Sequence, residues 1–247
     1  MSGWSNIWNS RLEKYPSQSG FQDNLEWLIH LNGFDKGAGA ISSADWKEGV
    51  RLAVAALSLQ PGDSLLELGC GSGAWVKAAS DLMELDIFGV DYSASLIEEA
   101  RRAVPTGNFR VGDIAGSLDT TLDSFASQPG FAVDVTVFHG VLHYLNETDA
   151  AEAILQAMDS SRSKVLLAEV PNSDLEHESE LHRSALHGAE NYKEDYQGLL
   201  HTSFNEEWFR TLLSRRQHDW EVEMVCPSWM KSGNRRFRFN ILFRRRV

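Results

Sequence analysis

The stretch LLELGCGSGAW, residues 65–75, decides the fold. It begins as a short apolar run typical of a buried strand and passes through glycines at positions 69, 71 and 73. It then continues as AWVKAASDLMEL, in which apolar residues recur at helical spacing. Glycine turns tightly and lets a ligand approach the backbone where a Cβ atom would clash. The stretch therefore predicts a strand, a sharp glycine turn and a helix.

Strands and helices alternate on both sides of this turn. A helix is predicted from Ser43 until shortly before Pro61, where a proline and a glycine end the pattern. Apolar strands are predicted at 63–69, which includes the strand just described, and at 86–91, 108–113, 131–140 and 164–172. Amphipathic helices separate them. Strands that are apolar throughout and alternate with helices indicate a parallel sheet covered on both faces. This is a doubly wound α/β fold, whose ligand lies at the C-terminal ends of the strands.

The end of the chain has a different pattern. Residues 173–202 are polar and rich in histidine, and NEEWFRTLLSRR (205–216) predicts a helix. WEVEMVCPSW (220–229) and RRFRFNILFRR (235–245) then predict two strands separated by five residues. Five residues are too few for a crossover helix, so these strands should pair as an antiparallel hairpin. The expected sheet has seven strands and is mostly parallel, with this C-terminal hairpin at its end.

No repeat, low-complexity tract or flexible linker divides the 247 residues, so a single domain is expected over 1–247. We expect four parts within it: an N-terminal cover segment (1–42), a cofactor-binding core (43–172), a substrate-cover insertion (173–202), and the last helix with the terminal strand pair (203–247). The sequence contains no heptad seam from which an oligomeric state could be read.

Composition excludes several classes of function. Lys and Arg number 23 against 35 Asp and Glu, a net charge of −12 that opposes binding to nucleic acid. The sequence has no apolar segment of the length that spans a membrane, and its first residues lack the apolar core of a signal peptide. Two cysteines are too few for a disulfide framework and suit a reducing compartment. A cytoplasmic protein is expected.

Histidines of the polar segment do not predict a metal site. His177 and His182 are five positions apart in HESELH. On a helix, five positions rotate one side chain by about 140° from the other. The two histidines therefore do not share a face, and no metal is expected.

Three carboxylates lie at or near the ends of the predicted strands. Glu67 stands two residues before the glycine turn, where it would repel a pyrophosphate and suit a positively charged ligand. Asp91 ends the next strand, where it could accept hydrogen bonds from two ribose hydroxyls, and Asp113 ends the third, where it could meet an adenine amino group. Gly69, Gly71 and Ala74 also satisfy the dinucleotide fingerprint, so an NAD-dependent oxidoreductase remains an alternative.

Four motifs in order resemble those of a known family. ELGCGSG (67–73), GVDYS (89–93), VGDI (111–114) and VDVTVFHGVLHYL (133–145) resemble the motif set of class I S-adenosylmethionine-dependent methyltransferases. The resemblance covers roughly residues 43–172, and the terminal strand pair matches the reversed last strand of that family. The opening W-x-x-x-W with NGFD also resembles, more weakly, a group of such enzymes that act on small metabolites.

The resemblance implies a set of cofactor-binding residues: Glu67, Gly69, Gly71, Gly73, Asp91, Tyr92, Asp113 and Ile114. In such enzymes the glycines would line the methionine portion of S-adenosylmethionine, and Glu67 would hold its amino group. Asp91 would bind the ribose, Tyr92 would pack on the adenine, and the last two residues would meet the adenine edge.

Catalytic and substrate residues are expected near the same edge of the sheet. His139 follows the apolar strand FAVDVTVF, so it should emerge beside the methyl group as a general base. His143, four positions later, would share this task or orient the substrate. Candidate substrate-pocket residues are Trp8, Asn172, His177, Tyr192 and Tyr196, with His182 and His187 in the same cover segment.

The resulting hypothesis is an enzyme that transfers a methyl group from S-adenosylmethionine to an O or N nucleophile of a small metabolite. Two alternatives are an NAD-dependent oxidoreductase and a noncatalytic, cofactor-binding scaffold. The expected partner is a small-molecule methyl acceptor, with neither nucleic acid nor a membrane.

Overall fold

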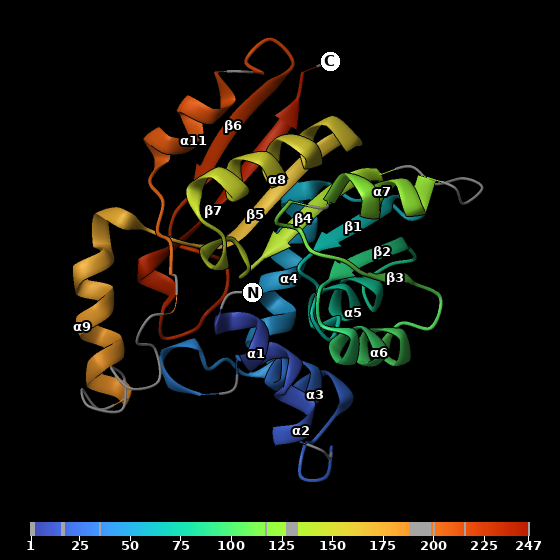
Figure 1. Ribbon diagram of the computed structural model, residues 1–247, viewed down its shortest axis with the longest axis vertical. Coiled ribbons are helices and arrows are strands. Elements are labelled where there is room, and N and C mark those ends of the chain that lie inside the picture. The colour runs from blue at the N-terminus through green and yellow to red at the C-terminus, as the bar shows by residue number, and fades with distance from the viewer. Residues whose placement is uncertain are drawn as a thin grey trace.

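The computed structural model describes residues 3–15, 18–34, 36–116, 118–126, 133–187, 199, 201–214 and 216–246. A seven-stranded sheet runs through the middle of the molecule, with helices on both faces (Figure 1). Its strands are β1 (Ser64–Leu68), β2 (Asp86–Asp91), β3 (Asn108–Val111), β4 (Val133–His139), β5 (Ser161–Pro171), β6 (Trp220–Val225) and β7 (Arg238–Arg245). Their order is β3-β2-β1-β4-β5-β7-β6. The first five are parallel, and β7 pairs antiparallel with both β5 and β6, which confirms the predicted fold.

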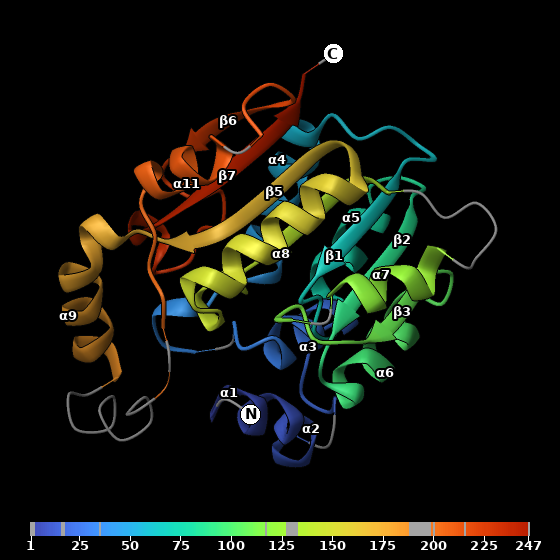
Figure 2. The same cartoon turned by 45° about the horizontal axis from the view of Figure 1, so that its top comes forward.

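Helices cover the two faces of the sheet in separate groups (Figure 2). One face carries α3 (Asn24–Leu31), α4 (Ser43–Leu57), α5 (Ala74–Ser80) and α6 (Ala94–Ala103). The other carries α7 (Leu118–Ala126), α8 (Glu147–Ser160) and α11 (Glu206–Leu213). Because both faces are covered, β1 is buried along its whole length, and this explains why its sequence is apolar rather than alternating.

Each face of the sheet has its own apolar core. Trp46 of α4 and Trp75 of α5 are fully buried in the first core. Phe209 of α11 and Phe243 of β7 are fully buried in the second. Burying aromatic side chains of this size removes some 150–250 Å² of surface each from water, which makes them leading contributors to the stability of the core.

Capping residues set the ends of α4. The Ser42 hydroxyl accepts a hydrogen bond from the Asp45 backbone N–H at 3.1 Å, which satisfies one free donor of the first turn. Ser58 ends the helix in the left-handed conformation, with φ of 53°. The helix after the glycine turn is shorter than predicted, because α5 ends at Ser80 instead of continuing to residue 85.

The terminal strand pair is shorter than its sequence suggests. The predicted strands over 220–229 and 235–245 pair only within Trp220–Val225 and Arg238–Arg245. Pro227 has no N–H to donate to a ladder, which prevents β6 from extending through it. The connection therefore exceeds the five residues predicted and includes a short 3₁₀ helix, η4 (Arg235–Phe237). The predicted antiparallel pairing is correct.

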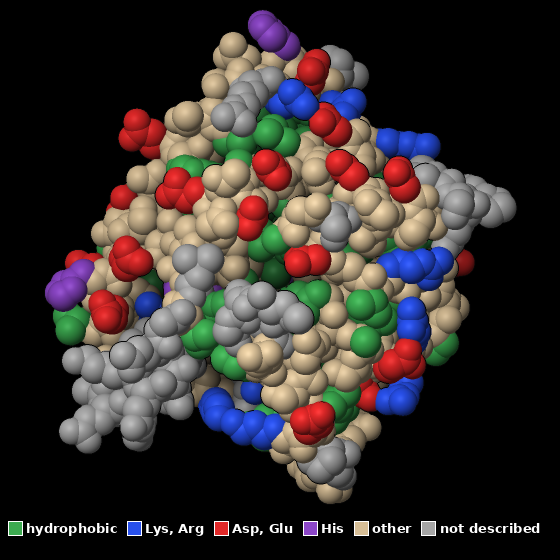
Figure 3. Space-filling model, in the orientation of Figure 1, with side chains coloured by type: hydrophobic (Ala, Val, Ile, Leu, Met, Phe, Trp, Pro, Cys, Tyr) green, Lys and Arg blue, Asp and Glu red, His purple; other side chains and the backbone are tan. Residues whose placement is uncertain are grey.

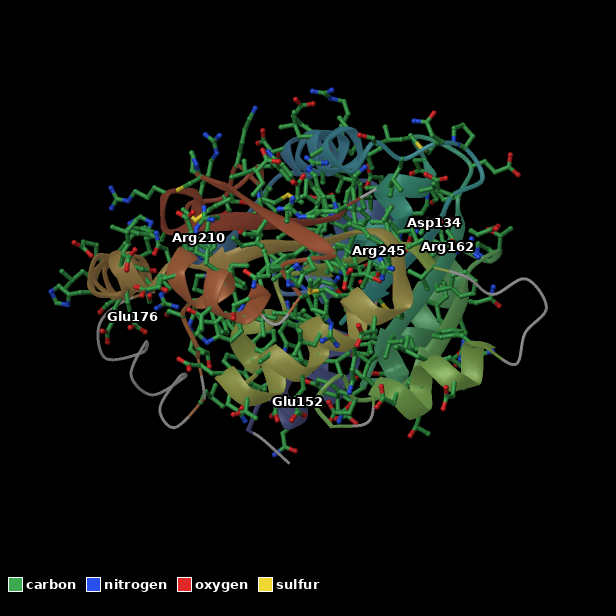
Figure 4. The ribbon with its side chains drawn as sticks, turned by 90° about the horizontal axis from the view of Figure 1, so that it is seen from above. Asp134, Glu152, Arg162, Glu176, Arg210 and Arg245 are labelled. Carbon is green, nitrogen blue, oxygen red and sulfur yellow. The ribbon has the colours of Figure 1, made fainter. Side chains whose placement is uncertain are left out.

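A polar clamp holds the edge of the sheet where β1 and β4 begin. The Asp134 carboxylate accepts hydrogen bonds from the Ser64 N–H at 2.9 Å and from its hydroxyl at 2.6 Å. Arg162 lies 3.6 Å from the same carboxylate, and Figure 4 shows the two side chains next to each other. The polar residues with predicted functions lie instead at the opposite, C-terminal edge.

Segments outside the sheet layers gather near that C-terminal edge. They are α1 (Gly3–Asn9), α2 (Arg11–Lys14), η1 (Gly37–Gly39), η2 (Leu142–Tyr144), η3 (Ser173–Leu175) and α9 (Glu176–His187). Within the predicted cover insertion, α9 stands apart from the sheet (Figure 1) and packs against η1 of the N-terminal segment. None of the helices that the structure describes is both long enough and apolar enough to cross a membrane.

Candidate functional site

The glycine turn joins β1 to α5 at the C-terminal edge of the sheet. Gly69, Gly71 and Gly73 have φ values of +77°, +52° and +81°, a conformation that strains other residues. A Cβ atom on Gly69 would lie 2.5 Å from the Val141 side chain, and one on Gly71 would lie 2.3 Å from the Asn32 side chain. In this structure the two glycines permit close approach of protein side chains, and their predicted contacts with the cofactor stay predictions.

Asn32, at the end of α3, holds the glycine turn. Its Oδ1 atom accepts hydrogen bonds from the Ser72 backbone N–H at 2.8 Å and from the Ser72 hydroxyl at 2.9 Å. The same hydroxyl lies 2.9 Å from the Leu28 carbonyl oxygen. The sequence associated NGFD with an enzyme group but assigned no role to Asn32, which the structure identifies as a positioning residue.

Asp91 links the end of β2 to the same turn. Its two carboxylate oxygens accept hydrogen bonds from the backbone N–H groups of Gly71 and Ser93, each at 2.9 Å. Burial raises the pKa of Asp91 to about 6, although both N–H groups oppose this rise. Asp91 thus lies beside the glycine turn, as expected for a ribose-binding residue, and each oxygen retains a further lone pair.

Glu67 is the most informative acid of the site. Its side chain is only 1% exposed on β1. Burial, together with the neighbouring Asp91 carboxyl, raises the pKa of Glu67 well above its ordinary value. Among the residues that the structure describes, no hydrogen-bond donor reaches its Oε2 atom. A buried carboxyl with an unused oxygen fits a positively charged ligand, such as the ammonium and sulfonium groups of S-adenosylmethionine, and would disfavour a pyrophosphate.

The three remaining predicted cofactor residues lie in different surroundings. The Tyr92 hydroxyl donates a hydrogen bond to the Trp4 carbonyl oxygen at 3.3 Å, which ties the end of β2 to α1. Ile114 is buried in the second core. Asp113 is exposed and accepts a hydrogen bond from the Ala115 N–H at 2.9 Å. Their predicted contacts with adenine stay predictions.

A cavity of about 410 Å³ lies between the N-terminal segment, the loop after β4, α9 and the start of β7. Trp4, Trp8 and Tyr144 form an aromatic part of its wall, with the Tyr144 ring centroid 4.7 Å from Trp4 and 5.9 Å from Trp8. Gly140, which follows β4, also lines it. Because Val141 packs on Gly69, this wall adjoins the glycine turn.

The two candidate catalytic histidines differ in their relation to this cavity. His143 lines it, and no partner for its Nδ1 atom occurs within the described part of the chain. His139 is not among the lining residues, and its ring centroid lies 5.5 Å from Phe34 and 4.9 Å from Trp46. Burial lowers the pKa of His139 to about 3. The structure therefore brings His143, rather than His139, to the cavity wall.

Charged and titratable neighbours also act on His143. Burial lowers its pKa well below the ordinary value, and His201, Arg238 and Arg183 lower it further. The His201 ring centroid lies 4.7 Å from that of His143. Burial likewise lowers the pKa of His201 to about 3, with smaller effects from the two arginines. Both rings are therefore neutral near neutral pH.

Of the candidate substrate residues whose side chains the structure describes, one lies in the cavity wall and three lie outside it. Trp8 is part of it, whereas Asn172 accepts a hydrogen bond from the Asp174 N–H at 3.0 Å and caps η3. His177 is exposed on α9, and the His182 ring packs 5.3 Å from Phe237. Tyr192, Tyr196 and the side chain of His187 lie outside the described residues.

Glu169 is a cavity residue that the sequence analysis missed. It is buried in β5 at a register shift opposite β7, with φ of 62°, a strained value for a residue other than glycine. The Ser228 hydroxyl donates to its carboxylate, and Arg238 Nη1 donates to its carbonyl oxygen at 2.9 Å. Burial raises the pKa of Glu169, and Arg238 opposes this. Glu169 is the one acid in the apolar run VLLAEV, and this position could have indicated a functional residue from the sequence.

Comparisons with known proteins agree with this fold. Magnesium protoporphyrin IX methyltransferase from Synechocystis PCC 6803, solved with bound SAM, is 16% identical, with a TM-score of 0.55 and 97% of each chain covered. The plantazolicin methyltransferase BpumL in complex with SAH is 15% identical, with a TM-score of 0.61 and coverage of 97% of this chain and 95% of that one. No curated protein sequence matches the chain.

Residues 65–163, from β1 to the beginning of β5, match the family model described as a methyltransferase domain. This match shows a methyltransferase domain over these residues, and the motifs and the sheet order are consistent with a class I S-adenosylmethionine-dependent methyltransferase. The class of enzyme and the cofactor predicted from the sequence are thereby confirmed.

Proposed function

We propose that this enzyme transfers the methyl group of S-adenosylmethionine to an oxygen or nitrogen atom of a small metabolite. The observation that carries the proposal is the cavity of about 410 Å³ whose wall adjoins the glycine turn. Its volume falls in the range typical of small-molecule sites, and its aromatic and polar lining is also typical. The names of the two similar enzymes, which refer to magnesium protoporphyrin IX and plantazolicin, are compatible with such an acceptor.

Residues of the glycine turn and its neighbours would hold the cofactor. Glu67 supplies a buried carboxyl for the positively charged portion, and Asp91 supplies oxygens for the ribose hydroxyls. The cofactor supplies a methyl carbon that its sulfonium group activates. Tyr92 and the covering helix α1 close this side of the site through the hydrogen bond to Trp4.

The residues of the cavity would position the acceptor for an in-line displacement. The cofactor would supply the methyl group, and its sulfur would keep the electron pair of the carbon–sulfur bond as the acceptor's lone pair bonds to the methyl carbon. Trp4, Trp8 and Tyr144 would exclude water from this region. His143 is the better placed of the two histidines to accept the acceptor's proton or a hydrogen bond from it. His139 would support the site from behind, between Phe34 and Trp46.

We also propose a cytoplasmic location, which the two free cysteines support: Cys70 is buried and Cys226 is exposed. A reducing compartment keeps such thiols unpaired.

Calorimetry and isotope labelling test the proposal together. We expect S-adenosylmethionine and S-adenosylhomocysteine to bind the full chain and NAD not to bind. Incubation with cofactor labelled in its methyl group and a cell extract should then give a labelled small molecule, detected by mass spectrometry. Binding of NAD without binding of S-adenosylmethionine would overturn the reaction class. Label found only in protein or nucleic acid would overturn the small acceptor.

A further inference from the structure

The cavity wall is rich in basic residues, whereas the protein as a whole has a net negative charge. Of the described residues that line the cavity, six are Lys, Arg, Asp or Glu, and five of these are cationic: Arg11, Lys14, Lys36, Arg183 and Arg238. The acid among the six is Glu169. Over the whole chain, 35 acidic residues outnumber 23 basic ones. Figure 3 shows Lys and Arg side chains gathered low on this face, between α2 and α9.

These cations come from four separate parts of the chain. Arg11 and Lys14 belong to α2, Lys36 follows α3, Arg183 belongs to α9 and Arg238 begins β7. Their convergence therefore depends on the packing of the N-terminal segment and α9 around the cavity, and it does not follow from a local run of basic residues. The strongly basic C-terminal end of the sequence contributes Arg238 to this wall.

Two of the arginines are held in orientation by neighbouring groups, and one of them, Arg238, is buried. Arg238 is 8% exposed and donates to the Glu169 carbonyl oxygen at 2.9 Å. Arg183 lies within 3.2 Å of His201 through its Nη1 atom. A guanidinium carries its N–H groups in a plane, a geometry that matches carboxylate and phosphate oxygens.

Unused polar atoms near these cations give a second, independent indication of a ligand. Ser232 Oγ, Asn234 Oδ1 and Trp8 Nε1 are buried and line the cavity. Within the described ranges of the chain, none of the three atoms has a hydrogen-bond partner. A hydroxyl and an indole N–H can donate to an anionic oxygen, and the amide oxygen can accept from a neighbouring hydroxyl of the same molecule. Buried polar groups in native proteins are nearly always paired, so these atoms fit a polar ligand.

We propose that the methyl acceptor is an anion, bearing a carboxylate or a phosphate ester that binds the cationic wall of this cavity at Arg183, Arg238 and Lys36. The proposal rests on the proposed function and narrows its substrate class. The cations of the wall would also draw such a substrate into the cavity of a protein whose overall charge repels it. Trp4 and Trp8 would contact the remainder of the molecule.

Anion binding to the full chain tests the wall directly. The probes are inorganic phosphate and citrate at constant ionic strength. The readout is the change in total tryptophan fluorescence, because two of the eight tryptophans, Trp4 and Trp8, line the cavity. The variant Lys36→Gln/Arg183→Gln removes two cations of the wall. Its matched control is Arg51→Gln/Arg210→Gln, which removes two cations paired with Glu48 and Glu206 away from the cavity.

We expect the Kd of both probes to rise at least about tenfold in the wall variant, because each lost cation removes charge-assisted hydrogen bonds. The control should stay within about twofold of the wild type. The affinity for S-adenosylhomocysteine, measured by calorimetry, should be the same in all three proteins. Equal anion affinity in the wall variant and the wild type, with cofactor binding intact, would overturn the anionic acceptor.

The labelled product provides a second test and separates the two possible anionic groups. A cell extract is divided by anion exchange before incubation with the enzyme and methyl-labelled cofactor. Label should appear in the retained fraction, and phosphatase treatment should abolish retention of a phosphate ester but not of a carboxylate. Label in the unretained fraction alone would overturn the anionic acceptor while supporting small-molecule methylation. Failure of the wild type to bind S-adenosylmethionine would overturn the proposed function itself.

Discussion

Asp91 holds the glycine turn through hydrogen bonds, and it is also predicted to bind the cofactor. It accepts hydrogen bonds from Gly71 and Ser93, and its remaining lone pairs would accept from the ribose. We expect Asp91→Ala to weaken binding of S-adenosylhomocysteine by about 1.5–3 kcal/mol, the range for hydrogen bonds to a charged group. Calorimetry measures this change. Asp86→Ala is the matched control, because Asp86 is exposed at the other end of the same strand and should leave the affinity unchanged.

His143 and His139 can be separated by their effects on turnover. We expect His143→Gln to reduce kcat by about 10²–10⁴-fold, the usual effect of removing a proton-transfer group, with little change in cofactor affinity. His139→Gln should reduce kcat less, because His139 packs between Phe34 and Trp46 and does not line the cavity. Steady-state kinetics with the acceptor identified by labelling measures kcat for both variants. A larger loss in His139→Gln would reassign the proton-accepting role to His139.

The sequence predicted residues whose role follows from their place on a strand, and missed those whose role depends on distant packing. Glu67 and Asp91 follow from the position of a carboxylate at the end of an apolar strand. Asn32 contacts the glycine turn only because α3 packs against α5, a contact between Asn32 and Ser72 across 40 residues of sequence. Glu169 lies where β5 shifts register against β7; its place as a lone acid in an apolar run marks it as unusual, but no local pattern encodes the shift or the cavity.

At the scale of elements, Gly71 is needed for its conformation and for the space around it. Its φ is +52°, and a Cβ atom would lie 2.3 Å from Asn32 Oδ1. Gly62 has a φ of +90°, but a Cβ atom on it would meet no residue beyond its chain neighbours within 4 Å, so it isolates the conformational effect. We expect Gly62→Ala to lower the free energy of unfolding by about 1 kcal/mol and Gly71→Ala by about 2–3 kcal/mol. Urea denaturation measures both, and equal losses would show that Asn32 yields freely.

The elements themselves were predictable where the hydrophobic pattern was long and periodic. Helix α4 and strands β1 to β5 appear close to their expected positions. The end of β6 was misjudged because Val225 and the residues after it continue the apolar pattern, while Pro227 cannot join the ladder. The polar segment after β5 carries helix α9, which packs mainly against η1 and not on the sheet, so it lacks the broad apolar stripe that reveals a core helix.

At the scale of the whole molecule, buried titratable groups of opposite kinds surround one edge of the sheet. Burial lowers the pKa values of His139 and His201 to about 3 and raises that of Asp91 to about 6. For the histidines, the unfolded chain binds the proton more readily between about pH 6.5 and pH 3, so stability is lost as the pH falls through that window. For Asp91, the folded protein holds the proton more tightly between its ordinary pKa of 3.8 and about 6, so stability is gained as the pH falls through about 6. The two effects oppose each other, and the pH profile of the wild type alone does not separate them.

The variant His139→Gln isolates the contribution of one histidine. Its side chain is 6% exposed, so removal of the imidazole removes a group that must stay neutral in the fold. The difference in free energy of unfolding between wild type and variant should be constant above about pH 6.5, where His139 is neutral in both the folded and the unfolded chain. Below that pH it should move in favour of the variant by up to about 1.4 kcal/mol per pH unit, or about 2–3 kcal/mol at pH 4.5.

Urea denaturation from about pH 4.5 to pH 8 measures this difference. His218→Gln is the control, because His218 is exposed beyond α11 and lies outside the buried edge of the sheet. A His139→Gln profile parallel to that of the wild type would mean that a proton reaches the His139 ring in the folded protein as easily as in the unfolded chain.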